Sequence, residues 1–351
     1  MKKIIIPVVL GFVASSYSLK AEKPLLMNDI HPEQLFSKQQ IEFEINSIAN
    51  KQTTDLSTLQ QEYLKLKQIN SVNANSVSDE DLVLLNQYKD YQSQTFIKHE
   101  EGPLPLAIFD IASAAKYKLN QYYVHQASLP YLKLRQDGWQ DFKLALVSAD
   151  ETSSIQQKAK LAAISDLSAS EYAELAKTLV ASRSYQDPLL VKAIANSKNT
   201  DLIGSLLQNN HSAATQRVMA KKLAEFNSQV QAEILQSVVA NNKKLASSAL
   251  IRYAKLPANA RSDQWLTELL SDHRLGASAA KAIGITQSQT ALEAAQAMIK
   301  NPSSNRTQVA NALLALRFAN NDYAKSELVH LLEHDQIRFE DMKLEVAKWL
   351  D

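Results

Sequence analysis

Three residues near the end of the chain, His330, Glu333 and His334, have the types and the spacing of a zinc site. On a helix, side chains four residues apart lie one turn apart on the same face, so both imidazoles can reach one ion. A glutamate beside them could then activate a metal-bound water. This segment is the place in the sequence where local spacing alone suggests catalytic chemistry.

The pattern His-x-x-Glu-His resembles that of the inverted zinc peptidases, which implies His330 and His334 as metal ligands and Glu333 as the group that activates water. That family takes its third ligand from a carboxylate far downstream, whereas this chain ends soon after His334. Helical spacing also places the two histidines opposite Leu328 and Leu331, on the face expected to meet solvent. We therefore expect no catalytic metal and no other cofactor, with adventitious metal binding at this surface instead.

The composition disfavours several other kinds of chemistry. The 351 residues include no cysteine, so neither a disulfide framework nor a thiolate metal site can form. Glycine is scarce, with 6 residues, and the glycine motifs of phosphate-binding loops and nucleophile elbows do not occur. The formal net charge of +1 argues against bulk nucleic-acid binding, so nucleic acid is not an expected partner.

The first residues match a secretory signal peptide. A basic start precedes a short apolar run, residues 4–14, and then small and polar residues. No apolar run in the chain approaches the length of a membrane-spanning helix, so no membrane span is expected. We predict cleavage after Ala21, with cleavage after Ser18 as the alternative, and hence a periplasmic or secreted protein. Removing residues 1–21 takes away three lysines and lowers the formal net charge from +1 to −2.

From about residue 151 the sequence repeats a pattern of paired, Ala/Leu-rich helices. Capping boxes such as Ser168-Ala-Ser-Glu171 indicate helix starts, because the hydroxyl and the carboxylate each accept from a backbone N–H. Small residues three to four apart, as in Val309–Arg317, let neighbouring helices approach closely. We predict about six pairs, with first helices that begin near Ser168, Thr200, Ser228, Ser262, Ser288 and Asn321.

The paired helices of residues 152–351 resemble the repeats of HEAT-like α-solenoids. The resemblance implies an all-α fold, with a right-handed α-α superhelix over residues 151–351. Armadillo and TPR-like units remain alternatives, because the recurring Asp and Arg/Lys positions of HEAT units are not regular here.

Residues 22–150 are also mostly helical but lack the repeat, so we expect a separate N-terminal or capping region there. Ser78 predicts the start of a helix that runs to about Lys98. Gly and Pro at residues 100–105 predict a break, and a long helix is expected after it, from about Leu106 to Gln126.

The two sets of repeat helices differ in charge. Asp and Glu dominate the predicted first helices, whereas Lys and Arg dominate the predicted second helices. In a solenoid each set lines its own surface, so the sequence predicts one acidic and one basic face. Alternatively, the charges pair across helix borders and cancel locally. The binding residues predicted on the basic face are Arg217, Lys221, Arg252, Lys281 and Arg317.

These patterns predict an exported, non-catalytic α-solenoid that acts as a binding scaffold. The expected partner is another envelope or secreted protein, or an anionic polymer. The alternative is an accessory or catalytic component of cell-wall (peptidoglycan) processing, because some periplasmic peptidoglycan-cleaving enzymes carry a similar helical superhelix; the Glu-Ser and Gly-rich motifs of their catalytic domain are absent here. A zinc peptidase, based on residues 330–334 alone, is the third possibility.

Overall fold

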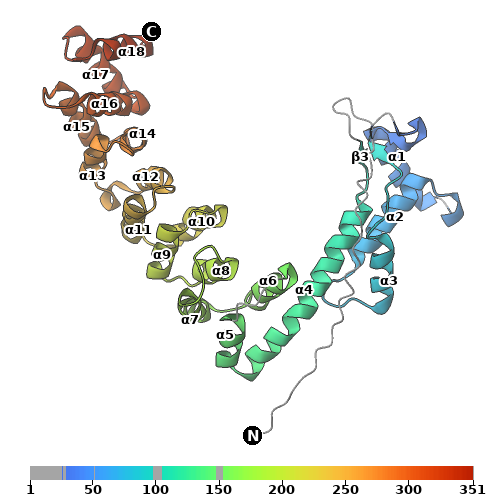
Figure 1. The fold of residues 1–351 in the computed structure, drawn as a ribbon. Coiled ribbons are helices and arrows are strands. Elements are labelled where there is room, and N and C mark those ends of the chain that lie inside the picture. The colour runs from blue at the N-terminus through green and yellow to red at the C-terminus, as the bar shows by residue number, and fades with distance from the viewer. Residues whose placement is uncertain (1–25, 27–28, 51, 98–104, 148–152, 351) are drawn as a thin grey trace, which may run out of the picture. The chain divides into compact units, whose positions relative to one another are not determined.

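The computed structural model describes residues 26, 29–50, 52–97, 105–147 and 153–350 (Figure 1). The predicted signal peptide, residues 1–21, lies outside the described residues. Apart from three strands of two residues each, the regular elements of the described ranges are helical, which confirms the predicted all-α fold. Contacts divide the chain into two units, one up to His125 and one from Gln126 onward.

The N-terminal unit consists of short helices and a small sheet. Its elements in chain order are η2 (Pro32–Gln34), β1 (Leu35–Phe36), α1 (Lys38–Ser47), η3 (Ile48–Asn50), η4 (Thr53–Asp55), α2 (Thr58–Ser71), α3 (Asp79–Tyr88), β2 (Phe96–Ile97), β3 (Leu106–Ala107) and the start of α4 (Ile111–Asp137). Strand β2 lies between the other two, parallel to β1 and antiparallel to β3.

Local capping and a small apolar core hold this unit together. Ser37, Ser57 and Ser78 each form a capping box at the start of α1, α2 and α3. The buried core joins α2, α3 and α4 through the side chains of Leu59, Ile69, Val72, Leu85, Phe109, Ile111, Ala115 and Leu119. The unit thus has its own core, as a separate region requires.

Three helix boundaries predicted for α3 and α4 are wrong. The helix capped by Ser78 ends at Tyr88 instead of near Lys98, because Phe96 and Ile97 pair with both neighbouring strands. The long helix α4 begins at Ile111 instead of near Leu106, which belongs to β3. It also continues past Gln126 to Asp137, with Pro130 inside it.

The second unit continues with helices in tandem. After α4 come α5 (Trp139–Val147), α6 (Ser154–Ala163), and the pairs α7 (Ala169–Val180) with α8 (Pro188–Asn196), α9 (Thr200–Asn209) with α10 (Ala213–Arg217), α11 (Ser228–Asn241) with α12 (Ala246–Ala254), α13 (Asp263–Glu268) with α14 (Gly276–Thr286), α15 (Gln289–Lys300) with α16 (Arg306–Ala319), and α17 (Asp322–Glu333) with α18 (Glu340–Leu350). Short turns extend some of them: η5 (Val218–Lys222), η6 (Leu223–Glu225), η7 (Ala258–Ala260) and η8 (Leu269–Ser271).

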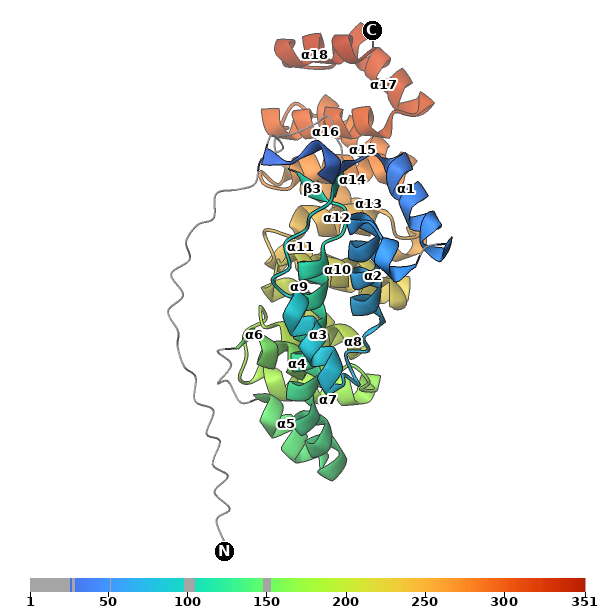
Figure 2. The ribbon, with the colours of Figure 1, turned by 90° about the vertical axis from the view of Figure 1, so that its right-hand side faces the viewer.

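The helix pairs stack in chain order (Figure 2). The residues that cap the first helices are Ser168, Asn199, Asn227, Ser262, Ser288 and Asn321, each at or next to the start predicted from the sequence. Second helices also pack against second helices, as α12 does on α14 and α14 on α16, while α9 packs on α11. First helices and second helices therefore line different sides of the stack, as the solenoid prediction requires.

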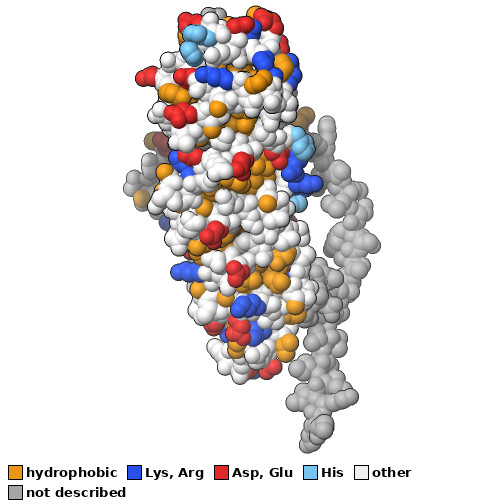
Figure 3. Space-filling model, turned by 90° about the vertical axis from the view of Figure 1, so that its left-hand side faces the viewer, with side chains coloured by type: hydrophobic (Ala, Val, Ile, Leu, Met, Phe, Trp, Pro, Cys, Tyr) orange, Lys and Arg blue, Asp and Glu red, His pale blue; other side chains and the backbone are white. Residues whose placement is uncertain are grey.

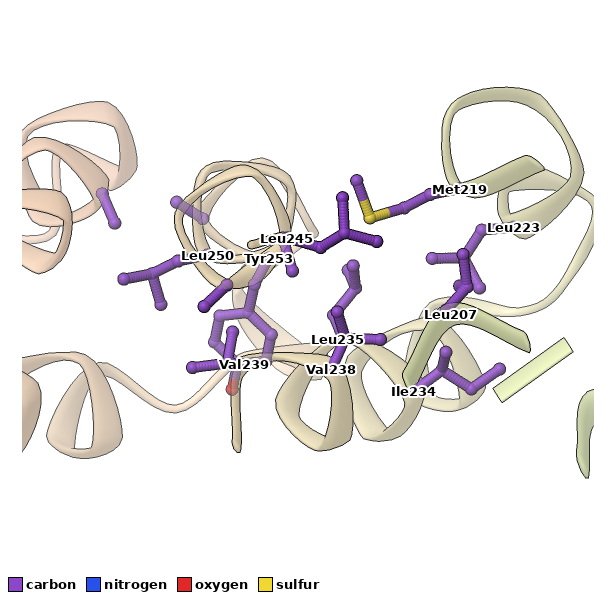
Figure 4. Close-up of a cluster of buried hydrophobic side chains, with 14 of the residues drawn as sticks. Leu207, Met219, Leu223, Ile234, Leu235, Val238, Val239, Leu245, Leu250 and Tyr253 are labelled. Carbon is purple, nitrogen blue, oxygen red and sulfur yellow. The ribbon is translucent and has the colours of Figure 1, made fainter. Parts of the chain in front are cut away.

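One continuous apolar core runs between the two sets of helices. Figure 4 shows a section of it, where Leu207, Met219 and Leu235 converge from three different helices. The ring of Tyr253 is buried in the same core, and its hydroxyl accepts a hydrogen bond from the Ser262 N–H at 2.6 Å. A contiguous core of this kind makes each pair depend on its neighbours for burial.

Two glycines of α14 lie close to atoms of α16. A methyl group at Gly284 would lie 2.5 Å from Phe318 Cβ, and one at Gly276 would overlap the Asn311 side chain. Asn311 is buried and donates from Nδ2 to the Leu270 carbonyl at 2.8 Å. Small side chains at these positions thus allow the two backbones to pack at short range.

The core of the second unit begins before the first repeat. Phe142 and Leu146 of α5 are fully buried in the same core as the repeat helices. The repeat pattern alone assigned residues up to 150 to the N-terminal region, whereas the contacts place the division at His125. The difference arises because α5 packs on α7 without carrying the Ala/Leu pattern of the pairs.

Candidate functional site

Two grooves cross the side of the second helices. The first, here called the α12–α16 groove, lies on α12, α14 and α16 and has a volume of about 550 Å³. Its cations are Arg252, Lys255 and Lys281, and Leu314 and Phe318 are among its apolar lining residues. Phe318 is 46% exposed, although it is a large apolar side chain. The groove thus combines positive charge with an accessible aromatic ring.

The second, here called the α8–η5 groove, lies between α8 and the helical segment 213–225 and has a volume of about 500 Å³. Its four cations are Lys192, Arg217, Lys221 and Lys222. Neither groove is lined by Asp, Glu or His. Four of the five binding residues predicted from the sequence therefore line these two grooves: Arg217, Lys221, Arg252 and Lys281.

The grooves between first helices have the opposite charge. Asp263 and Glu268 line a groove of about 470 Å³ on α13 and α15, and Asp201 and Glu233 line one of about 390 Å³ on α9 and α11. No Lys or Arg lines either of them. Figure 3 views the side of the first helices, where acidic side chains and some Lys and Arg side chains lie among hydrophobic patches. The charge difference between first and second helices that the sequence shows is therefore also present in the individual grooves.

Most of the groove cations are not neutralised locally. Within the described ranges, Arg217, Lys221, Lys255 and Lys281 form no ion pair and no side-chain hydrogen bond. Arg252 reaches only the Ala220 carbonyl, at 3.5 Å. Pairing across helix borders, the alternative raised by the sequence, therefore does not remove the charge of the two grooves.

Arg317, the fifth predicted residue, is placed differently. It lines neither groove, and its guanidinium lies over the ring of Trp349 in α18, 4.5 Å from the ring centroid. An arginine stacked on an indole gains a cation–π interaction. The geometry gives Arg317 a contact that joins α16 to the last helix of the stack.

The His-x-x-Glu-His segment forms the end of α17. The rings of His330 and His334 lie with centroids 4.0 Å apart, and His334 Nδ1 is 3.0 Å from the His330 carbonyl oxygen. His334 is exposed, as expected, whereas His330, also expected to be exposed, is half-buried; Glu333 is exposed. Among the described residues, no group of three or more His, Asp or Glu side chains is placed to hold one metal ion. The segment thus brings two imidazoles together without assembling a three-ligand set.

The N-terminal unit contains a buried carboxylate that sequence analysis did not select. Glu62 of α2 is fully buried; its Oε1 accepts from the Gln94 N–H at 2.8 Å, and its Oε2 accepts from the Thr95 hydroxyl. Burial, together with the charge of Glu62 and hydrogen bonding to it, raises the pKa of Tyr91 to about 12. The hydrogen bonds of Glu62 thus tie α2 to the segment before β2, and the Tyr91 phenol stays protonated at neutral pH.

Comparisons with protein-family models, curated proteins and solved structures find no match to this chain. No helix in the described ranges is both long and apolar enough to cross a membrane. A functional proposal for this chain therefore depends on the grooves and charges described above.

Proposed function

We propose that this chain is an exported, non-catalytic α-solenoid that binds another envelope or secreted protein, or an anionic polymer, through its second-helix side. The observation that carries the proposal is the charge of the grooves: those between second helices are lined by Lys and Arg without acids, and those between first helices by acids without Lys or Arg. Unpaired cations on one side of a solenoid attract an anionic partner and accelerate its association.

Binding is favoured over catalysis by the composition of the same grooves. Their ionisable groups are cations only, so neither groove offers a carboxylate or an imidazole as a general base. The apolar side chains next to the cations add area that a partner can bury. Export is supported by the basic start and the apolar run within residues 1–21.

The test compares two triple variants with the same change in net charge. Arg217→Glu, Arg252→Glu and Lys281→Glu reverse the groove cations, whereas Lys243→Glu, Lys300→Glu and Lys325→Glu reverse exposed lysines outside both grooves. Partners retained from an envelope extract are identified by mass spectrometry, and their affinity is measured against salt.

We expect the groove triple to weaken the retained partner by roughly tenfold or more, because each lost contact removes an attraction and each new carboxylate adds repulsion. The control triple should change the affinity by less than about twofold, since exposed charges distant from a contact are largely screened. A partner that binds the groove triple as tightly as the wild type, without salt dependence, would refute the proposal.

A further inference from the structure

The α8–η5 groove has a backbone feature of its own. Val218–Lys222 form a π-helical turn, in which the Leu223 N–H donates to the Val218 carbonyl. No other π-helical turn occurs in the part of the chain that the structure describes. Such turns are rare and are frequently found at functional sites. Here Val218, Lys221 and Lys222 line the groove, while Met219 remains in the core.

Two of the four cations of the α8–η5 groove have no partner among the described residues. Lys192 Nζ donates to the Leu161 carbonyl at 2.7 Å, and its partial burial lowers its pKa. Lys222 Nζ pairs with Glu225 Oε1 at 2.9 Å. Arg217 and Lys221 are exposed and have no such partner among the described residues. Two free charges one helical turn apart thus lie along one wall of the groove.

The remaining lining is largely apolar. Val191 and Ala195 contribute from α8, and Ala214 and Val218 contribute from the opposite helical segment. An anionic polysaccharide or polyphosphate would meet Arg217 and Lys221 but would gain nothing from this apolar lining. An apolar side chain flanked by carboxylates would use both parts, since it removes apolar surface from water while its charges reach the rim.

We propose that the α8–η5 groove binds a short acidic segment of a protein partner. One apolar side chain of that segment lies between Val191 and Val218, and flanking Asp or Glu carboxylates pair with Arg217 and Lys221. The assignment rests on the proposed function and narrows it, from an anionic partner of either kind to a peptide segment at one defined groove.

The test uses peptides selected on the full chain. A random dodecapeptide library displayed on phage is enriched against the protein, and the leading peptide is synthesised with a fluorescent label. Its affinity is measured by fluorescence polarisation for the wild type, Ala214→Trp and Ala213→Trp. Both alanines are exposed in α10, but only Ala214 lines the groove, so the indole at Ala213 is the matched control. Labelled poly-L-glutamate serves as the probe for a purely anionic polymer.

We expect the enriched peptides to combine Leu, Ile or Phe with neighbouring Asp or Glu. Ala214→Trp, which fills the groove, should weaken the leading peptide by roughly tenfold or more, and Ala213→Trp by less than about twofold. Arg217→Glu should weaken it to a similar degree as Ala214→Trp, with a salt dependence that is reduced relative to the wild type. Circular dichroism of each variant checks that the helices are intact.

Other outcomes overturn the inference. No enrichment, or an enriched peptide that ignores Ala214→Trp, shows that this groove is not the peptide site. If that peptide is lost instead in Arg252→Glu with Lys281→Glu, the proposed function survives and only the groove assignment fails. Poly-L-glutamate that binds as tightly as the peptide identifies polymer docking instead. Self-association in sedimentation that Ala214→Trp abolishes identifies a second copy of the chain as the occupant.

Discussion

Because α14 and α16 pack closely at Gly284, we expect two glycine-to-alanine substitutions, at Gly284 and at Gly204, to change the stability of the protein in opposite directions. Gly284 and Gly204 both lie inside helices, so in each case alanine lowers the conformational entropy of the unfolded chain and contributes about 0.5–1 kcal/mol of stability. At Gly204 the nearest atom that the new methyl group would meet outside the helix backbone is Gln208 Nε2, at 4.0 Å. We therefore expect Gly204→Ala to stabilise the protein by about 0.5–1 kcal/mol.

At Gly284 the same methyl group would lie 2.5 Å from Phe318 Cβ, 2.7 Å from Phe318 C and 2.9 Å from Ala319 N. Two of these atoms are backbone, so α16 must move away, and overpacking of this kind costs about 1–3 kcal/mol. This cost exceeds the gain in helix propensity. We expect Gly284→Ala to destabilise the protein by a net ~1–2 kcal/mol.

The assay is thermal unfolding followed by circular dichroism at matched protein concentration. For a unit of this size, the unfolding midpoint shifts by about 2–4 °C for each kcal/mol of change in the free energy of unfolding. The two variants should therefore differ by about 3–12 °C, with the wild type between them. A midpoint for Gly284→Ala at or above that of Gly204→Ala would refute the close packing of α14 on α16.

The remaining predictions concern export, repeat coupling and the histidine pair. The exported protein should begin at Glu22, and N-terminal sequencing that finds residue 1 on a soluble exported form would contradict this. A 22–257 fragment should aggregate, because the cut leaves the apolar side of α12 that packs on α14 uncovered; a monomeric, fully helical fragment in light scattering and circular dichroism would instead place a domain boundary there. His330→Ala with His334→Ala should leave the unfolding midpoint within a few degrees of the wild type, about the effect of a surface change. Purified wild type should carry substoichiometric zinc by elemental analysis, and stoichiometric zinc that the double variant loses together with a peptidase activity would overturn the non-catalytic assignment.

Capping in this chain is a local property, and it was predictable to within a residue. Ser168 and Ser262 each accept a hydrogen bond from an N–H of the helix that follows them, and this signal is present in four consecutive residues. The asparagines at repeat ends were less predictable. Asn320 takes the left-handed conformation, with φ of 48°, but Asn210 and Asn242 do not. Their side-chain amides instead donate hydrogen bonds to backbone carbonyls of the preceding repeat, and local sequence spacing does not reveal these contacts.

The segment 89–97 shows where local reasoning failed. Helix-forming residues after Tyr88 suggested a longer helix, but Phe96 and Ile97 pair with Leu35 and with Leu106. Leu35 is distant in the sequence, and a strand of two residues has no periodicity to detect. The buried Glu62 is a similar case, because its partners Gln94 and Thr95 are brought to it by the same tertiary arrangement.

The sequence by itself determined the helix pairs, their approximate starts and the segregation of charge between them. Each of these depends on residue type and helical spacing, which act over a few residues. The tertiary structure alone decided which cations are available: Arg217 and Lys221 line a groove beside a π-helical turn, whereas Arg317 lies on Trp349. The physical reason is that a groove forms only where helices pack side by side, and the contacts of a charged side chain depend on which neighbouring helix packs next to it.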